Sequence, residues 1–136
     1  MHYAFIVLLC NGVMVAYCAP ILPHVHLRGE EYSENFLERG FYDARKVGAI
    51  ALLEQPNPEP QLTCEKSIEQ RIRQSEPYRN GVHHGVHIGL TNNLSQVIQA
   101  FILAKSHKHN IAGVKAFWVH STGNMGILDH EIQKGI

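Results

Sequence analysis

The ten histidines of this 136-residue sequence are the side chains whose number and spacing first suggest chemistry. Two pairs, His24-x-His26 and His107-x-His109, have the spacing at which two imidazole nitrogens can share one cation. The sequence contains no His-Glu-x-x-His motif. A histidine-rich metal-binding protein is therefore one hypothesis, whereas the interpretation preferred below requires no metal and no small-molecule cofactor.

General acid–base chemistry is the second hypothesis. Cleavage of RNA by transesterification needs a base for the 2′-hydroxyl, an acid for the leaving 5′-oxygen and a cation for the phosphate, but no metal. His130 could be the acid and Lys115 the cation, because both belong to a stretch that predicts two strands joined by a turn at residues 121–124. No Gly-x-Ser-x-Gly sequence supports nucleophilic catalysis instead.

Hydrophobic spacing predicts the elements that would position these residues. Isoleucines recur four residues apart within residues 64–75, which predicts a one-sided helix capped by Thr63. The alternation of residues 82–90 predicts a strand, with His83 and His87 on one face and Val82, His84, Val86, Ile88 and Leu90 on the other. At the rise of a strand these two histidines would lie about 13 Å apart, too far to share one ion.

Residues 94–105 are compatible with two structures. Asn93 and Gln96 resemble the capping box of a helix, and apolar residues follow at helical spacing. Residues 99–103 could equally form a strand, so both alternatives stay open.

The N-terminal part of the sequence predicts export. Residues 3–16 are almost wholly apolar, a run too short to span a bilayer and typical of the core of a secretory signal. Small residues at positions 16 and 18 favour cleavage after Cys18; a buried N-terminal helix is the alternative. We therefore predict a signal peptide over residues 1–18 and a secreted mature protein without a membrane segment.

A proline run divides the remaining chain. Residues 19–62 are expected to be a loosely structured acidic segment, with an extended arm, a short helix over residues 30–39 and an apolar AIALL run that is a helix turn or a strand. Three prolines between residues 56 and 60 predict a linker or boundary before a domain of residues 63–136. Cys64 is the one cysteine of the mature chain, so no internal disulfide is expected and its role stays open.

Charge is balanced overall but unevenly distributed. Residues 19–63 carry four basic and seven acidic side chains, whereas residues 64–136 carry eight basic and five acidic ones. A mildly basic C-terminal half can meet an anionic partner such as RNA.

Three short segments resemble the fungal guanyl-specific ribonucleases and the ribonuclease-like secreted effectors of powdery mildew fungi, over about residues 63–132. Gln99-Ala100-Phe101-Ile102-Leu103 occupies the place of the glutamate strand, and Lys115-Ala116-Phe117-Trp118 that of the arginine strand. Gly126-Ile127-Leu128-Asp129-His130 occupies the place of the histidine strand. The resemblance implies an α+β fold, in which one N-terminal helix packs on a small twisted antiparallel sheet, preceded by a loosely structured extension.

The same resemblance implies a secreted effector that binds a host protein or RNA without catalysis. Gln99 at the glutamate position cannot accept a proton, so His130 would be a remnant of the catalytic acid. Lys115, His83, His87 and Gln99 would contact RNA or phosphate. An active ribonuclease using His130 and a secreted metal-binding protein are the alternatives, and the oligomeric state stays open.

Overall fold

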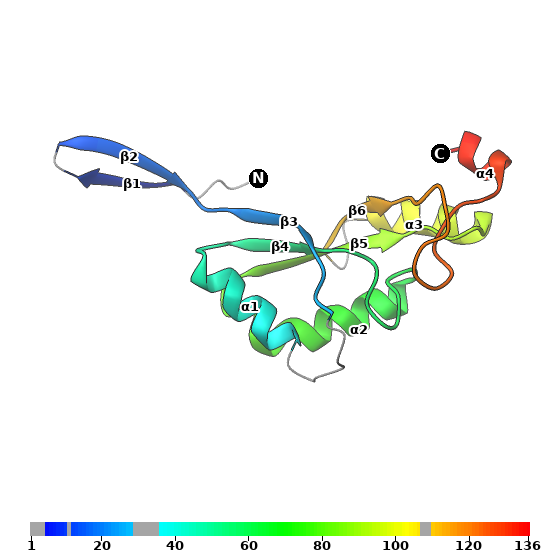
Figure 1. Ribbon diagram of the computed structural model, residues 1–136, viewed down its shortest axis with the longest axis horizontal. Coiled ribbons are helices and arrows are strands. Elements are labelled where there is room, and N and C mark those ends of the chain that lie inside the picture. The colour runs from blue at the N-terminus through cyan, green and yellow to red at the C-terminus, as the bar shows by residue number, and fades with distance from the viewer. Residues whose placement is uncertain (1–4, 11, 29–35, 107–109) are drawn as a thin grey trace.

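The computed structural model describes residues 5–10, 12–28, 36–106 and 110–136, and its centre is a four-stranded parallel sheet (Figure 1). The strands lie side by side in chain order: β3 (Ile21–Val25), β4 (Ala51–Glu54), β5 (His83–Gly89) and β6 (Ile111–Lys115). Helices α1 (Phe36–Lys46), α2 (Glu65–Ser75) and α3 (Leu94–Lys105) connect successive strands. The other elements are the hairpin of β1 (Phe5–Cys10) and β2 (Val13–Cys18), a 3₁₀ turn η1 (Glu76–Tyr78) and the short helix α4 (His130–Lys134).

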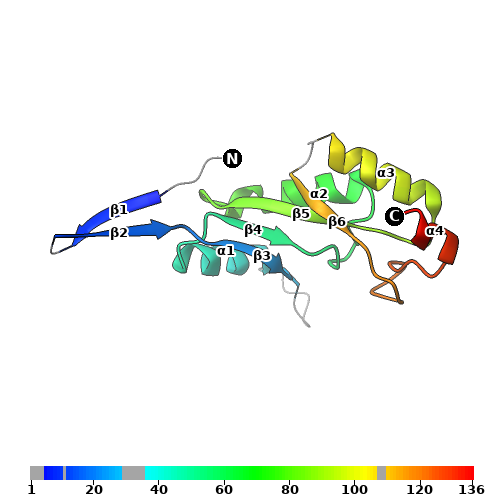
Figure 2. The same ribbon diagram turned by 90° about the horizontal axis from the view of Figure 1, so that it is seen from above.

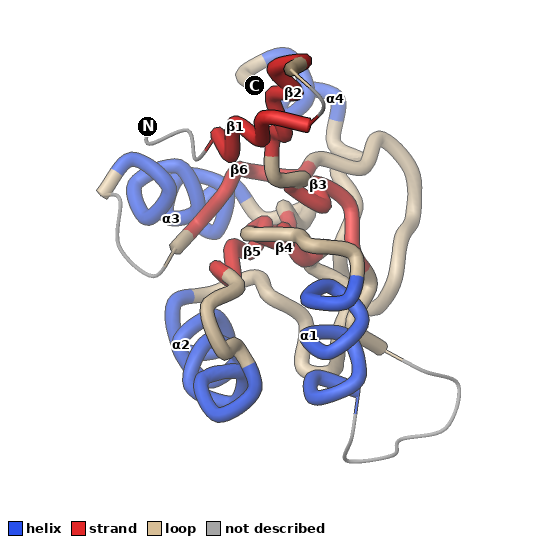
Figure 3. The backbone as a smooth tube through the Cα atoms, turned by 90° about the vertical axis from the view of Figure 1, so that its left-hand side faces the viewer, coloured by secondary structure: helices blue, strands red, loops and turns tan. Residues whose placement is uncertain are grey.

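All three connecting helices pack on one face of the sheet. Figure 3 looks along the strands and shows α1 and α2 below them and α3 beside β6. Alternate residues of β5 point to this face, and Val86 and Ile88 are fully buried in a core shared with α2 and α3. Phe41 of α1 packs in the same layer against the ring of His84, with 5.3 Å between the ring centroids. Burying each large apolar side chain stabilises the fold by about 1.5–3 kcal/mol. The side chains between this face of the sheet and the helices therefore form the core.

The predicted strand over residues 82–90 is confirmed together with its two faces. Its apolar-face members are each at most 4% exposed: Val82, His84, Val86, Ile88 and Leu90. On the opposite face His83 is exposed and His87 is half-buried. Period-2 alternation therefore identified the strand and the residues of each of its faces.

The two helices of the C-terminal half agree with their sequence signals. α2 spans the predicted helix but is capped by Cys64 rather than Thr63. The helical alternative for residues 94–105 is confirmed, and the side chain of Asn93 accepts a hydrogen bond from the amide of Gln96 at its start.

The predicted antiparallel sheet with a single helix is wrong. The three strand pairs of the four-stranded sheet are all parallel, and the described residues contain four α-helices. Parallel neighbours need long crossovers, which α1, α2 and α3 provide. The two strands expected between residues 116 and 128 are not present; this stretch is a loop in which Met125 forms one antiparallel bridge with Thr91.

The expected loose N-terminal extension is also wrong, because residues 21–54 supply two of the four strands of the sheet. The expected extended arm contains β3, and the AIALL run contains β4, so the strand alternative holds there. α1 continues through Gly40, where the predicted helix was to end. Residues 55–58, expected in a linker, are buried directly after β4.

The predicted signal peptide contains the β1–β2 hairpin, which forms a sheet separate from the other four strands. Its cleavage after Cys18 stays a prediction. Within the described ranges, no helix is long and apolar enough to cross a membrane.

Candidate functional site

The carboxyl ends of the parallel strands meet at one edge of the sheet, which Figure 2 shows from above. The last ladder pairs of β3 with β4 and of β4 with β5 place His26, Gln55 and His87 next to one another in the following row. Because successive residues alternate between faces, this row points away from the helices. Ligands of parallel α/β proteins bind beyond the carboxyl ends of the strands. The four strands here lie in chain order without a switch point, so the row is the candidate site because its polar side chains gather there.

His24 and His26 form a close imidazole pair at the end of β3. Nε2 of His24 lies 3.2 Å from Nε2 of His26, and the ring centroids are 5.1 Å apart. Both side chains are exposed. Partial burial of the ring and then the positive charges of Arg28 and His24 lower the pKa of His26. His26 is therefore neutral at pH 7, the state in which an imidazole nitrogen can bind a metal.

His87 is held by its neighbours on β4. Its Nδ1 atom lies 3.1 Å from the main-chain oxygen of Glu54 and 3.2 Å from Nε2 of Gln55. The carbonyl oxygen can only accept, which favours the proton on Nδ1 and leaves Nε2 with its lone pair. Oε1 of the buried Gln55 has no partner among the described residues. If the amide group of Gln55 is turned over, this oxygen can accept a hydrogen bond from the Nδ1–H of His87.

Two cationic side chains lie at the same edge. Lys115 is the last residue of β6, pairs with Gly89 of β5 and adds to the positive potential at His26. Arg28 follows β3 and donates a hydrogen bond of 3.3 Å from Nη1 to the main-chain oxygen of Asn57. Lys115 belongs to one outer strand of the sheet and Arg28 follows the other, and both add positive potential at His26.

The loop of residues 116–129 closes one side of the site. Nδ2 of Asn57 donates a 3.1 Å hydrogen bond to Oγ1 of Thr122, so the loop after β6 reaches the segment after β4. Met125 is buried, and a Cβ atom at Gly89 would lie against its sulfur. The stretch that was predicted to form a catalytic hairpin is therefore a loop that borders the candidate site.

The residues predicted from the sequence are only partly brought together. Lys115 and His87 lie at the candidate edge, whereas His83 lies at the opposite end of β5. Gln99 is exposed on α3, and His130 is the exposed first residue of α4. A ribonuclease-like site requires the last two on neighbouring strands of one sheet, which is not their arrangement.

Sequence reasoning missed the residues that follow β4. Gln55 and Asn57 lie within the proline run that was interpreted as a linker. A usable signal was present, because polar residues directly follow the apolar run Ala51–Leu53, as they do at the carboxyl end of a buried strand.

A complete set of metal ligands does not exist as the side chains now lie. The described part of the chain contains no group of three or more His, Cys, Asp or Glu side chains placed to hold one ion. The second predicted pair, His107 and His109, falls outside the described residues. His24 and His26 are thus a pair of neighbouring imidazoles and not a complete ligand set.

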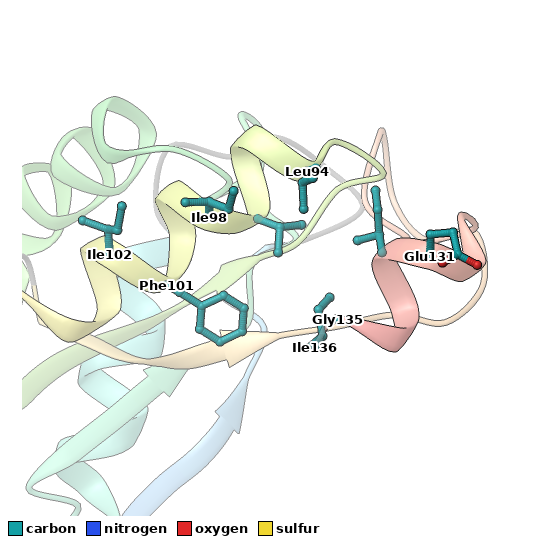
Figure 4. A pocket seen from close by; sticks show the side chains of 9 residues that line it. Leu94, Ile98, Phe101, Ile102, Glu131, Gly135 and Ile136 are labelled. Carbon is teal, nitrogen blue, oxygen red and sulfur yellow. The ribbon is translucent and has the colours of Figure 1, made fainter.

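A cavity of about 310 Å³ between α3 and α4 differs from this edge in character (Figure 4). Its lining is almost wholly apolar and comes from two helix surfaces: Leu94, Val97, Ile98, Phe101, Ile102, Glu131, Ile132, Gly135 and Ile136. Glu131 is the one ionisable side chain of this lining, so the cavity offers shape and apolar area rather than reactive groups.

Comparison with known proteins gives no family for the chain: no family model matches it, and no curated protein matches it.

Proposed function

We propose that the chain binds a divalent transition-metal ion through His24 and His26 and uses it to hydrolyse an anionic substrate at the carboxyl edge of the sheet. The observation that carries this proposal is the 3.2 Å separation of the two Nε2 atoms. Two nitrogens bound to one Zn²⁺ at about 2.05 Å with a tetrahedral angle would lie about 3.3 Å apart. The pair already has the spacing that one ion requires.

A hydrogen bond between the two rings is the competing explanation of this distance. It would need one ring to donate and the other to accept, at a separation at the upper end of the usual range. One feature favours the ion: both rings are exposed at the candidate site, where an ion and its remaining ligands can reach them. The two imidazoles would then be two of the four ligands that zinc prefers.

The surroundings suit hydrolysis. Two protein ligands leave positions for water and substrate, and a bound divalent cation polarises such groups. Arg28 and Lys115 supply positive charge for an anionic substrate. His87, with Nε2 unprotonated, is the candidate base that would accept a proton from the attacking water.

The other hypotheses from the sequence have less support. The ribonuclease-like fold that underlay the effector hypothesis differs from the parallel sheet. Secretion and binding of a host protein or RNA stay predictions. The metal-binding alternative is the one that gains a geometric argument from His24 and His26.

Metal titration of the purified full chain tests the proposal. Isothermal titration with Zn²⁺ and absorbance titration with Co²⁺ should show one tight site per chain. His24→Ala and His26→Ala should each weaken it by about 100-fold or more, since each removes a direct ligand and loss of an outer-shell partner alone costs 10- to 100-fold.

Matched histidine variants control for non-specific binding. His83→Ala removes an exposed histidine from the far end of β5, and His107→Ala/His109→Ala removes the second pair; neither should change the tight site. Absence of stoichiometric binding, or binding that survives loss of both His24 and His26, would contradict the proposal.

A further inference from the structure

A buried ion pair lies beside the chain that follows the proposed metal ligand His26. Nε of Arg71, on α2, lies 2.9 Å from Oε2 of Glu54, and its Nη2 lies 2.6 Å from Oε1. The Glu54 side chain is 1% exposed and that of Arg71 13% exposed. This two-pronged geometry fixes the plane of the guanidinium group.

The same guanidinium group reaches the chain that follows β3. Nη2 of Arg71 donates a 2.7 Å hydrogen bond to the main-chain oxygen of Leu27. Leu27 comes immediately after His26, and its side chain is buried in the core with α1. Arg71 therefore connects the carboxylate of Glu54 on β4 to the peptide group between Leu27 and Arg28.

This connection is important because β3 ends before the site. The last ladder pair of β3 is at Val25, and residues 26–28 continue without strand pairing. β3 is also an outermost strand of the four-stranded sheet, so within that sheet it pairs with β4 on one side alone. Arg71 and the packing of Leu27 hold the backbone where the ladder no longer does.

We propose that Arg71, fixed by Glu54, is a positioning residue that sets the backbone after His26 and thereby the 3.2 Å geometry of the His24–His26 pair. This inference rests on the proposed metal-binding function. Arg71 lies behind the sheet edge among the helices and contacts neither imidazole in the described interactions, so its effect passes through the peptide of Leu27.

A buried ion pair is a poor choice for stability alone. The free energy needed to remove two charges from water is about as large as the free energy gained from their attraction. A pair of apolar residues of similar volume therefore often gives the same stability. A directional contact to one carbonyl oxygen is what an apolar pair could not provide. A positioning role is therefore one that this pair can have and that an apolar pair could not.

The test compares Arg71→Lys with Arg73→Lys, the same substitution on the same helix. Arg71→Lys keeps the positive charge beside Glu54, but a single ammonium group cannot reproduce the two-pronged contact together with the bond to Leu27. Arg73 is exposed and pairs with Glu69 at 3.8 Å, away from the ion pair. Glu54→Gln is the second test variant, because it keeps the size of the group while it removes the charge that fixes Arg71.

Three quantities are measured for each variant: Co²⁺ affinity, the visible absorption spectrum of the Co²⁺ complex, and the free energy of unfolding without metal. We expect Arg71→Lys and Glu54→Gln to weaken Co²⁺ binding by about 10- to 100-fold and to alter the spectrum, as loss of an outer-shell partner does. Arg73→Lys should leave affinity and spectrum unchanged.

Two results would overturn the inference. If Arg71→Lys and Glu54→Gln lower stability while Co²⁺ affinity and spectrum stay at their wild-type values, the pair is structural only, although the proposed metal site stands. If the wild-type chain binds no Co²⁺ through His24 and His26, the proposed function fails and this inference fails with it.

Discussion

Nε2 of His84 lies 3.0 Å from Oε2 of Glu54, and both residues are 0% exposed. The carboxylate can only accept, so the imidazole donates from Nε2. Nδ1 of the same ring lies 2.8 Å from Oγ of Ser75 on α2. His84 therefore joins the middle of β5 to the buried ion pair behind the candidate site, and its protonation state is linked to the stability of the fold.

The stability of the protein should decrease in mild acid because of His84. Burial lowers the pKa of His84, against the opposing effect of Glu54. As the pH falls below about 6.5, the unfolded chain takes up the proton more readily than the folded protein does, because the pKa of His84 is lowered in the fold. This residue should leave the free energy of unfolding constant above pH 6.5, and reduce it below that pH by at most about 1.4 kcal/mol per pH unit.

Urea denaturation between pH 5 and pH 8 measures this effect. His84→Asn removes the titrating ring, so its free energy of unfolding should depend less steeply on pH than that of the wild type, whatever its absolute stability. Equal slopes in the two proteins would show that His84 does not contribute.

The bond between Asn57 and Thr122 should couple the loop of residues 116–129 to the end of β4. Asn57 is 8% exposed, and its amide donates to the threonine hydroxyl at 3.1 Å. Asn57→Ala and Thr122→Val should each reduce the free energy of unfolding by about 0.5–1.5 kcal/mol. In a double-mutant cycle the second substitution should cost little once the first is present; full additivity would contradict a direct interaction.

Local sequence patterns predicted the middle of the chain better than its ends. The alternation around His84 identified β5 because both faces of that strand differ in polarity, and the spacing before Ser75 identified α2. Neither pattern indicates whether neighbouring strands run parallel or antiparallel. The order of apolar runs and helical segments, strand then helix repeated, was the available sign of parallel βαβ units.

Two strand assignments were misled by single residues and by propensity. Pro23 made β3 look like an irregular arm, yet β3 is the edge strand of its sheet, where a missing N–H is tolerated. The aromatic run at Phe117 and Trp118 has high β-propensity but lies after β6, in a loop. Its contacts, such as the 2.8 Å bond from the Ile127 amide to the Phe117 oxygen, depend on tertiary packing.

The same loop should be destabilised by one methyl group at Gly126. This glycine has φ of +128°, and a Cβ atom there would lie 2.5 Å from the main-chain oxygen of Val119. Because a non-glycine residue is strained in this conformation, Gly126→Ala should cost about 1–3 kcal/mol in the free energy of unfolding. Gly135→Ala is the control, since its Cβ would have no neighbour closer than 3.6 Å. Equal effects of both substitutions would contradict the conformation of the loop.

Cys64 should react faster with alkylating reagents at neutral pH than an ordinary thiol. It is exposed at the N-cap of α2. Partial burial opposes ionisation, but the hydrogen bond with the Ser67 side chain and those from the amides of Ser67 and Lys66 outweigh it and lower the pKa of the thiol. Since the thiolate is the nucleophile, a lowered pKa raises the rate at pH 7.

Ser67→Ala should slow this reaction at pH 7 but not at pH 10, where the thiol is ionised in both proteins and accessibility alone sets the rate. Site-resolved mass spectrometry after iodoacetamide treatment separates Cys64 from Cys10 and Cys18. Ser95→Ala, an exposed serine that lines the same surface depression as Cys64, is the control and should leave both rates unchanged. If Ser67→Ala slowed the reaction equally at pH 7 and pH 10, the serine would be acting on access to the sulfur and not on its pKa.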